Sequence, residues 1–171
     1  MEEVVLVDHM DNEIGVAEKL SAHLDGSLHR AFSIFLFNSQ GEMLIQRRAS
    51  DKYHSSDLWS NTCCSHPRPN ENLQAAAERR LYEELGMKTD LTWLLSFKYK
   101  ISFDNGLIEH ELDHVFVGTT DQEASLNPKE VSEVKYISPE DLKLDLAQNP
   151  DHYTFWFKEL VDKVIENYPK Q

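Results

Sequence analysis

The chain has 171 residues, 40% hydrophobic and 27% charged, which predicts one globular domain over residues 1–171. The net charge of −13 argues against nucleic acid and anionic membranes as partners, because both are negatively charged. We see neither an apolar run near the roughly 20 residues of a membrane helix nor a signal peptide. The only two cysteines are adjacent and rarely reach disulfide geometry, so we expect a reduced, cytoplasmic protein.

The first half of the chain is mostly extended. Apolar runs predict strands over residues 4–7, 31–37 and 43–47. Turn-like residues occupy 11–15, and a hairpin turn is expected at 38–41. The polar stretch 48–56 predicts a loop.

The second half adds the helices. Residues 73–85 are the clearest helix, because Asn70 or Asn72 can cap it and Gly86 ends it. Further elements are strands over 92–102, 111–118 and 134–137, a turn at 104–106, a capping box from Ser138, and a final helix over about 153–167. The fold class is therefore α+β, with a mixed β-sheet flanked by helices.

The segment of residues 59–68 holds both cysteines, Cys63 and Cys64, and then His66. In an extended segment, residues two apart point to the same side. Cys64 and His66 can therefore share one pocket. Cys63 faces the opposite side and is predicted to belong to the core.

Charged residues recur at fixed spacing around the predicted helix 73–85. They are Glu71, Arg79, Glu83, Glu84 and Gly86. This is the spacing of a Nudix box, whose carboxylates hold divalent cations against a diphosphate. Ser65 stands where the box opens with glycine, and Arg80 stands where a glutamate is expected. Because Arg80 can bind phosphate oxygens, this change favours binding a diphosphate over hydrolysing it. A simpler interpretation is a surface helix in which Arg80 pairs with Glu84.

A second group of residues suits a divalent metal. His23 and His29 flank a polar turn, His66 follows the cysteines, and Glu109 and Glu111 point to one side of a strand. Three imidazoles and two carboxylates can form a five- or six-coordinate site. A lone histidine is more often structural or exposed. The chain simply carries many others: His9, His54, His110, His114 and His152.

Together these residues resemble the type I isopentenyl diphosphate isomerases of the Nudix superfamily. The resemblance spans nearly the whole chain and is most specific in residues 61–67, Asn-Thr-Cys-Cys-Ser-His-Pro. It implies a Nudix-type fold and the isomerisation of isopentenyl diphosphate to dimethylallyl diphosphate, an early step of isoprenoid biosynthesis. We expect these two diphosphates as partners, and a monomer or weak homodimer.

The resemblance also implies roles for particular residues. The catalytic residues are Cys64, Glu111, Tyr99 and Trp156, of which Trp156 faces a carbocation. A divalent metal, Mn²⁺, Mg²⁺ or Zn²⁺, is held by His23, His29, His66, Glu109 and Glu111. A Mg²⁺ ion that bridges to the diphosphate is held by Glu84. The diphosphate is bound by Lys19, Arg48, Lys52 and Arg80.

Other functions fit less of the sequence. A Nudix hydrolase acting on a nucleoside diphosphate derivative needs an intact box, so Arg80 counts against it, and it gives no role to Cys64 or Trp156. A cysteine hydrolase would place Cys64 and His66 two apart on one strand, a poor geometry for a nucleophile and its base. A metal-binding domain without enzymatic activity explains the histidines only.

Overall fold

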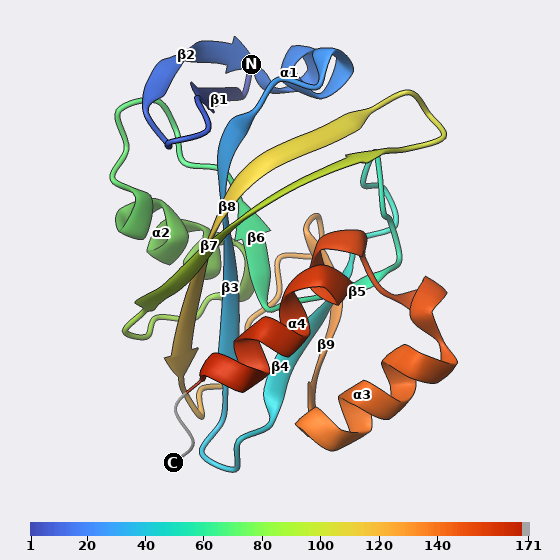
Figure 1. Cartoon of the computed structure of the whole chain (residues 1–171). Coiled ribbons are helices and arrows are strands. Elements are labelled where there is room, and N and C mark those ends of the chain that lie inside the picture. Colours follow the sequence, from blue (N-terminus) through green and yellow to red (C-terminus); the bar gives the residue numbers. More distant parts are fainter. Residues whose placement is uncertain (169–171) are drawn as a thin grey trace.

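The computed structural model describes residues 1–168 and contains a mixed β-sheet with helices on both faces (Figure 1). The central strand, β3 (His29–Phe37), pairs in parallel with β8 (Ile108–Thr119), and β7 (Thr92–Ser102) continues the sheet antiparallel to β8. On its other side β3 pairs antiparallel with β4 (Met43–Arg48) and β6 (Cys63–Ser65). The expected α+β fold with a mixed sheet is confirmed.

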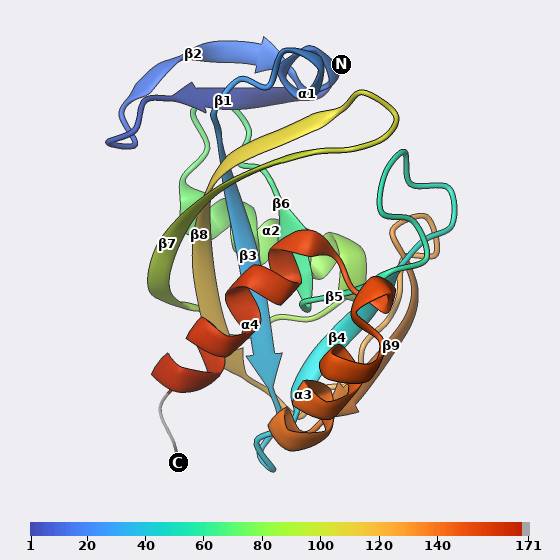
Figure 2. The same ribbon diagram turned by 45° about the vertical axis from the view of Figure 1, so that its right-hand side comes forward.

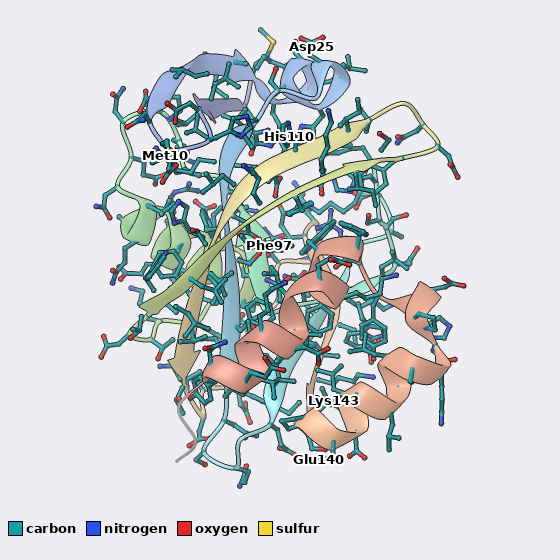
Figure 3. All side chains as sticks on the ribbon, viewed as in Figure 1. Met10, Asp25, Phe97, His110, Glu140 and Lys143 are labelled. Atoms are coloured by element: carbon teal, nitrogen blue, oxygen red, sulfur yellow. The ribbon has the colours of Figure 1, made fainter. Side chains whose placement is uncertain are left out.

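Two hydrophobic layers lie on the two faces of β3. Phe35 packs in the layer that includes α4 (Phe155–Asn167), and Ile34 packs in the layer that includes α2 (Leu73–Leu85). This follows from the alternation of side chains along a strand. Figure 2 shows α4 in front of the sheet and α2 behind it. Phe97 of β7, labelled in Figure 3, packs against the α4 layer. Helices cover both faces of β3, and for this reason the strand is apolar along most of its length.

The remaining elements lie around this centre. β1 (Glu3–Val7) and β2 (Glu13–Glu18) form a hairpin across one end of the sheet and lead into α1 (Lys19–Asp25) (Figure 2). The other elements are β5 (Trp59–Ser60), β9 (Val131–Ile137), α3 (Pro139–Gln148) and the 3₁₀ helix η1 (Pro150–His152). No helix within residues 1–168 is long and apolar enough to cross a membrane.

Helix α2 begins and ends where its sequence predicts. The Asn72 side chain accepts a hydrogen bond from the Ala75 backbone N–H at 3.1 Å. Gly86 follows the helix in the left-handed conformation, with φ of 63°. A Cβ at this position would also lie 2.9 Å from Ser125 Cβ. Both the backbone conformation and the close contact therefore require glycine.

Several predicted boundaries differ from the structure. Residues 13–15 belong to β2 rather than to a turn, because pairing with β1 overrides their weak strand propensity. Helix α1 was not predicted. Strands β8 and β9 each begin three residues earlier than predicted, and α4 begins two residues later. The single domain over residues 1–171 stays a prediction.

Candidate active site

A cavity of about 700 Å³ lies next to Cys64, Ser65 and His66. Eleven of the thirteen predicted site residues line it: Lys19, Arg48, Lys52, Cys64, His66, Arg80, Glu84, Tyr99, Glu109, Glu111 and Trp156. The other two, His23 and His29, are 0% exposed. The fold thus brings residues from α1, β4, β6, α2, β7, β8 and α4 to one place.

Four of the predicted metal ligands form one group. Ligand atoms of His23, His29, His66 and Glu111 all lie within 4.8 Å of one another. The parallel register of β3 and β8 sets His29 opposite Glu111. His66 Nε2 lies 2.8 Å and His29 Nε2 lies 3.4 Å from Glu111 Oε1. Three imidazoles therefore surround one carboxylate.

The histidines of this group are arranged as metal ligands. His23 Nδ1 lies 2.6 Å from the Lys19 carbonyl and His29 Nδ1 lies 2.9 Å from the Ser27 carbonyl, which directs each Nε2 lone pair inward. Both Nε2 atoms are buried without a hydrogen-bond partner among residues 1–168. Burial lowers the pKa of His23 and lowers that of His66 to about 4, so both are in the neutral form that binds metals. The donor set fits a divalent cation.

Glu109, the fifth predicted ligand, lies in a second group with His23 and His54. Its Oε1 atom is 3.0 Å from His54 Nε2. His54 belongs to the polar stretch 48–56, in which sequence reasoning found no pattern, so its part in the site was missed. His110 lies between these two glutamates in sequence but contacts the Gly26 carbonyl, at the junction of β8 and α1 (Figure 3).

Tyr99 joins the two groups. Its hydroxyl donates to Glu111 Oε2 at 2.6 Å and lies 3.1 Å from Glu109 Oε2. Burial, together with these two carboxylates, raises the pKa of Tyr99 well above its usual value. Tyr99 therefore remains a hydrogen-bond donor and fixes the orientation of Glu111.

The two cysteines face opposite sides of β6. Cys63 is 0% exposed in the α2 layer, which confirms the prediction that it belongs to the core. Cys64 faces the cavity. Burial, with the charges of Glu84 and Glu111, raises the pKa of Cys64 to about 12, although Arg48 acts in the opposite direction. Cys64 is a protonated thiol at neutral pH.

Glu111 is in the opposite protonation state. Burial alone would raise its pKa, but the imidazoles of His29 and His66, whose Nε2 atoms face Glu111 Oε1 at 3.4 and 2.8 Å, hold the pKa of Glu111 well below its usual range. The cavity thus presents one protonated thiol and one carboxylate. Two titratable groups whose environments separate their pKa values are the arrangement that acid–base chemistry needs.

Basic residues surround another part of the cavity, and carboxylates neutralise three of them. Lys19 pairs with Glu2 at 3.1 Å, and Lys52 pairs with Glu130. Arg80 lies 3.4 Å from the same Glu130. Glu130 was not singled out by the sequence, because nothing in its neighbourhood repeats a motif.

Arg48 and Trp156 form the remaining wall. The Arg48 guanidinium lies 5.3 Å from the centre of the Trp156 ring. Trp156 Nε1 donates to Asn61 Oδ1 at 3.2 Å, and the ring is almost fully buried. A tryptophan fixed in this way offers a flat, electron-rich face to the cavity.

The box residues of α2 form a network of ion pairs. Arg79 binds Glu71 at 2.6 Å and Glu83 at 3.1 Å. Arg80 binds Glu83 at 2.8 Å and Glu84 at 2.6 Å, so the i,i+4 pair expected for a simple helix is also present. Arg80 therefore offsets part of the negative charge of Glu83 and Glu84.

Comparison with known proteins first defines the class. The NUDIX domain family model matches residues 27–157. A Deinococcus radiodurans protein of known crystal structure superposes with a TM-score of 0.78 at 21% identity, over 98% of this chain and 100% of that chain. The NUDIX fold expected from the box is therefore confirmed.

Curated relatives narrow the class. Isopentenyl-diphosphate Delta-isomerase 2 of Aromatoleum aromaticum is 50% identical over 164 residues, 96% of this chain and 87% of the relative. Isopentenyl-diphosphate Delta-isomerase of Pectobacterium atrosepticum is 50% identical over 156 residues, 91% of this chain and 87% of the relative. The chain belongs to the isopentenyl-diphosphate Delta-isomerase family, as its resemblance predicted.

Proposed function

We propose that this protein interconverts isopentenyl diphosphate and dimethylallyl diphosphate, with Cys64 and Glu111 as its proton-transfer groups. The observation that carries the proposal is the protonated thiol of Cys64 and the carboxylate of Glu111 in one cavity. One group can donate a proton while the other accepts one. The relatives that share half of the sequence support the same activity.

The reaction moves a double bond by one position. Protonation of the terminal alkene carbon gives a tertiary carbocation, and loss of a proton from the carbon on the other side gives the isomer. An alkene is a very weak base, so its protonation needs a positioned acid in a dry pocket. The face of Trp156 stabilises the cation by about 2 kcal/mol when water is excluded. Each turnover exchanges the protonation states of the two groups, which must then be reset.

The other residues hold the substrate and the ions. The diphosphate is bound by Lys19, Arg48, Lys52 and Arg80. Glu84 would hold a Mg²⁺ ion that offsets the charge of the diphosphate, and the histidine group with Glu111 and Glu109 would hold Mn²⁺, Mg²⁺ or Zn²⁺. When bound, the second metal supplies positive charge that orients Glu111 and tunes its acidity. Tyr99 holds the same carboxylate from its other oxygen.

A NUDIX hydrolase acting on a nucleoside diphosphate derivative is the second candidate. Arg80 is paired with Glu83 and Glu84 in the structure, so these carboxylates are partly neutralised by a fixed guanidinium. A hydrolase also leaves the thiol of Cys64, which lines the cavity, and Trp156 without a role. The isomerase therefore explains more of the cavity. We expect it to act in the cytoplasm as a monomer or weak homodimer.

Proton NMR of isopentenyl diphosphate with the enzyme, Mg²⁺ and Mn²⁺ in D₂O tests the activity. We expect dimethylallyl diphosphate that carries deuterium. Cys64→Ala and Glu111→Gln should each lower kcat by about 10²–10⁴-fold, the usual contribution of a general acid or base. Cys63→Ala is the matched control and should retain kcat. Phosphate release without isomer would favour the hydrolase, and near wild-type turnover of either variant would contradict its role.

A further inference from the structure

We propose that His54 is a positioning residue of the metal centre, which holds the Glu109 carboxylate through a hydrogen bond from Nε2. This inference deepens the proposed function and rests on the metal site proposed above. It assigns a role to the polar loop between β4 and β5, which carries His54 into the wall of the cavity. His54 acts through Glu109 and is not itself a metal ligand.

The hydrogen bond follows from the atoms that meet. His54 Nε2 lies 3.0 Å from Glu109 Oε1, and the two side chains are 5% and 6% exposed. A carboxylate oxygen can only accept, so the ring proton lies on Nε2 and is donated to Glu109. The other ring nitrogen, Nδ1, then accepts from the Ser55 hydroxyl at 3.2 Å. Tyr99 approaches the second oxygen of Glu109. Both carboxylate oxygens are therefore held.

Aromatic contacts fix the plane of the His54 ring. The ring stacks on Phe103 at 5.0 Å between centroids, with 19° between the planes. The edge-to-face neighbours are Trp156 at 6.0 Å and Tyr53 at 4.6 Å. Contacts from three directions leave the imidazole one orientation. Such a ring can hold a carboxylate in place rather than follow it.

The loop backbone adopts unusual conformations around His54. Ser55 and Asp57 have φ of 51° and 60°, in the left-handed region that side chains other than glycine adopt at a cost of roughly 1–2 kcal/mol each. Asn105 Nδ2 donates to the Tyr53 carbonyl at 3.2 Å and ties the loop to the turn between β7 and β8. Strain of this kind gathers at functional sites, where the surrounding structure maintains it.

The two ligand groups show why His54 positions Glu109 rather than binding the metal ion itself. His23 belongs to both groups, but its single free nitrogen, Nε2, can bind only one ion. The group with His29, His66 and Glu111 offers four ligands, whereas the group with His54 offers three. The ion is therefore assigned to the larger group. Glu109 is the fifth proposed ligand of this ion, and His54 is its own hydrogen-bond partner.

Mn²⁺ binding to the metal-free full-length protein tests this role by isothermal titration, without substrate. Loss of such an outer partner typically weakens metal binding by 10–100-fold, so His54→Ala should raise the Kd for Mn²⁺ by about that factor. His54→Gln should bind within about 3-fold of wild type, because its amide nitrogen reaches the position of Nε2. The matched control is His114→Gln. His114 also pairs with a carboxylate, Asp11 at 2.9 Å, but does not line the cavity.

The outcomes separate this inference from the proposed function. If the wild-type protein does not bind Mn²⁺, the proposed metal site and this inference both fail. If the wild-type protein binds and His54→Ala binds equally well, only this inference fails. If His54→Gln is as weak as His54→Ala, His54 is a ligand and the positioning role is overturned. Circular dichroism verifies the fold, and His54→Leu, which keeps the contact with Phe103, replaces His54→Ala should the latter fail to fold.

Discussion

The neighbours of each side chain determine the chemistry of the two adjacent cysteines and of Glu111. Cys63 and Cys64 differ by one position on β6, yet one lies in the α2 layer and the other lines the cavity. The imidazoles of His29 and His66 stabilise the charge of Glu111, whereas the surroundings of Cys64 oppose a charge. The difference between a proton donor and a proton acceptor is thus a property of each residue's neighbours.

The pH dependence of thiol alkylation tests this difference. The thiolate is the reactive form. Because the pKa of Cys64 is raised from 9.0 to about 12, its thiolate becomes more abundant only as pH rises toward that value. We expect the rate of Cys64 modification by iodoacetamide to increase about tenfold per pH unit from pH 8 to 11 without a plateau. Mass spectrometry locates the label. A plateau near pH 9, as in the denatured protein, would contradict the assigned pKa.

At the scale of elements, α2 presents its charged side to the cavity and its apolar side to β3. Ala76, Ala77 and Leu81 are buried against the sheet. Arg80 lies on the other side, where it reaches Glu83 and Glu84 of its own helix and Glu130 of the segment before β9. One guanidinium therefore connects the helix to a distant loop.

Replacement of Arg80 by glutamate restores the usual box but removes this connection. Arg80→Glu removes the ion-pair partner of Glu84, takes one of two partners from Glu83 and from Glu130, and adds a further negative charge. We expect a loss of stability of about 3–5 kcal/mol, typical of breaking a buried ion pair, and a KM for isopentenyl diphosphate raised at least about tenfold. Denaturant unfolding and steady-state kinetics measure the two effects. Arg80→Lys keeps the charge and should lie between the two proteins, whereas an unchanged KM in Arg80→Glu would contradict a role in diphosphate binding.

Elements with local signals were predictable, and those held by distant contacts were not. Helix α2 carries its own cap at Asn72 and its own stop at Gly86, so its limits were predicted to the residue. Helix α1 is capped by Glu18 and Gly26, but its seven residues are too few to show a helical periodicity in the sequence. The loop that carries His54 is shaped by left-handed residues and by contacts with Phe103 and Asn105 of the turn between β7 and β8.

The same distinction applies to the site. The resemblance named the thirteen residues by position, and the fold places them together. It did not indicate that Glu109 meets His54, a residue outside the predicted set. Nor did it indicate that Glu130 pairs with Lys52 and Arg80. Pairings between loops are determined by the packed molecule and leave no periodic pattern in the sequence.

At the scale of the whole molecule, the metal group joins four parts of the chain. His23 lies in α1, His29 in β3, His66 directly after β6 and Glu111 in β8. These residues are far apart in an unfolded chain, so an ion bound to all four is bound by the folded state alone. Binding of this kind stabilises the fold by mass action.

Thermal unfolding with and without metal therefore tests the site independently of catalysis. At a Mn²⁺ concentration of 100 times Kd, binding adds about 2.7 kcal/mol. For a chain of this size each kcal/mol raises Tm by about 2–4 °C, so the total is roughly 5–10 °C. EDTA should reverse the increase. His29→Ala removes one ligand from the centre of the group and should abolish most of the response, whereas His152→Ala, on η1, should retain it. Equal Tm values for the wild-type protein with Mn²⁺ and with EDTA would show that these four residues do not hold an ion together.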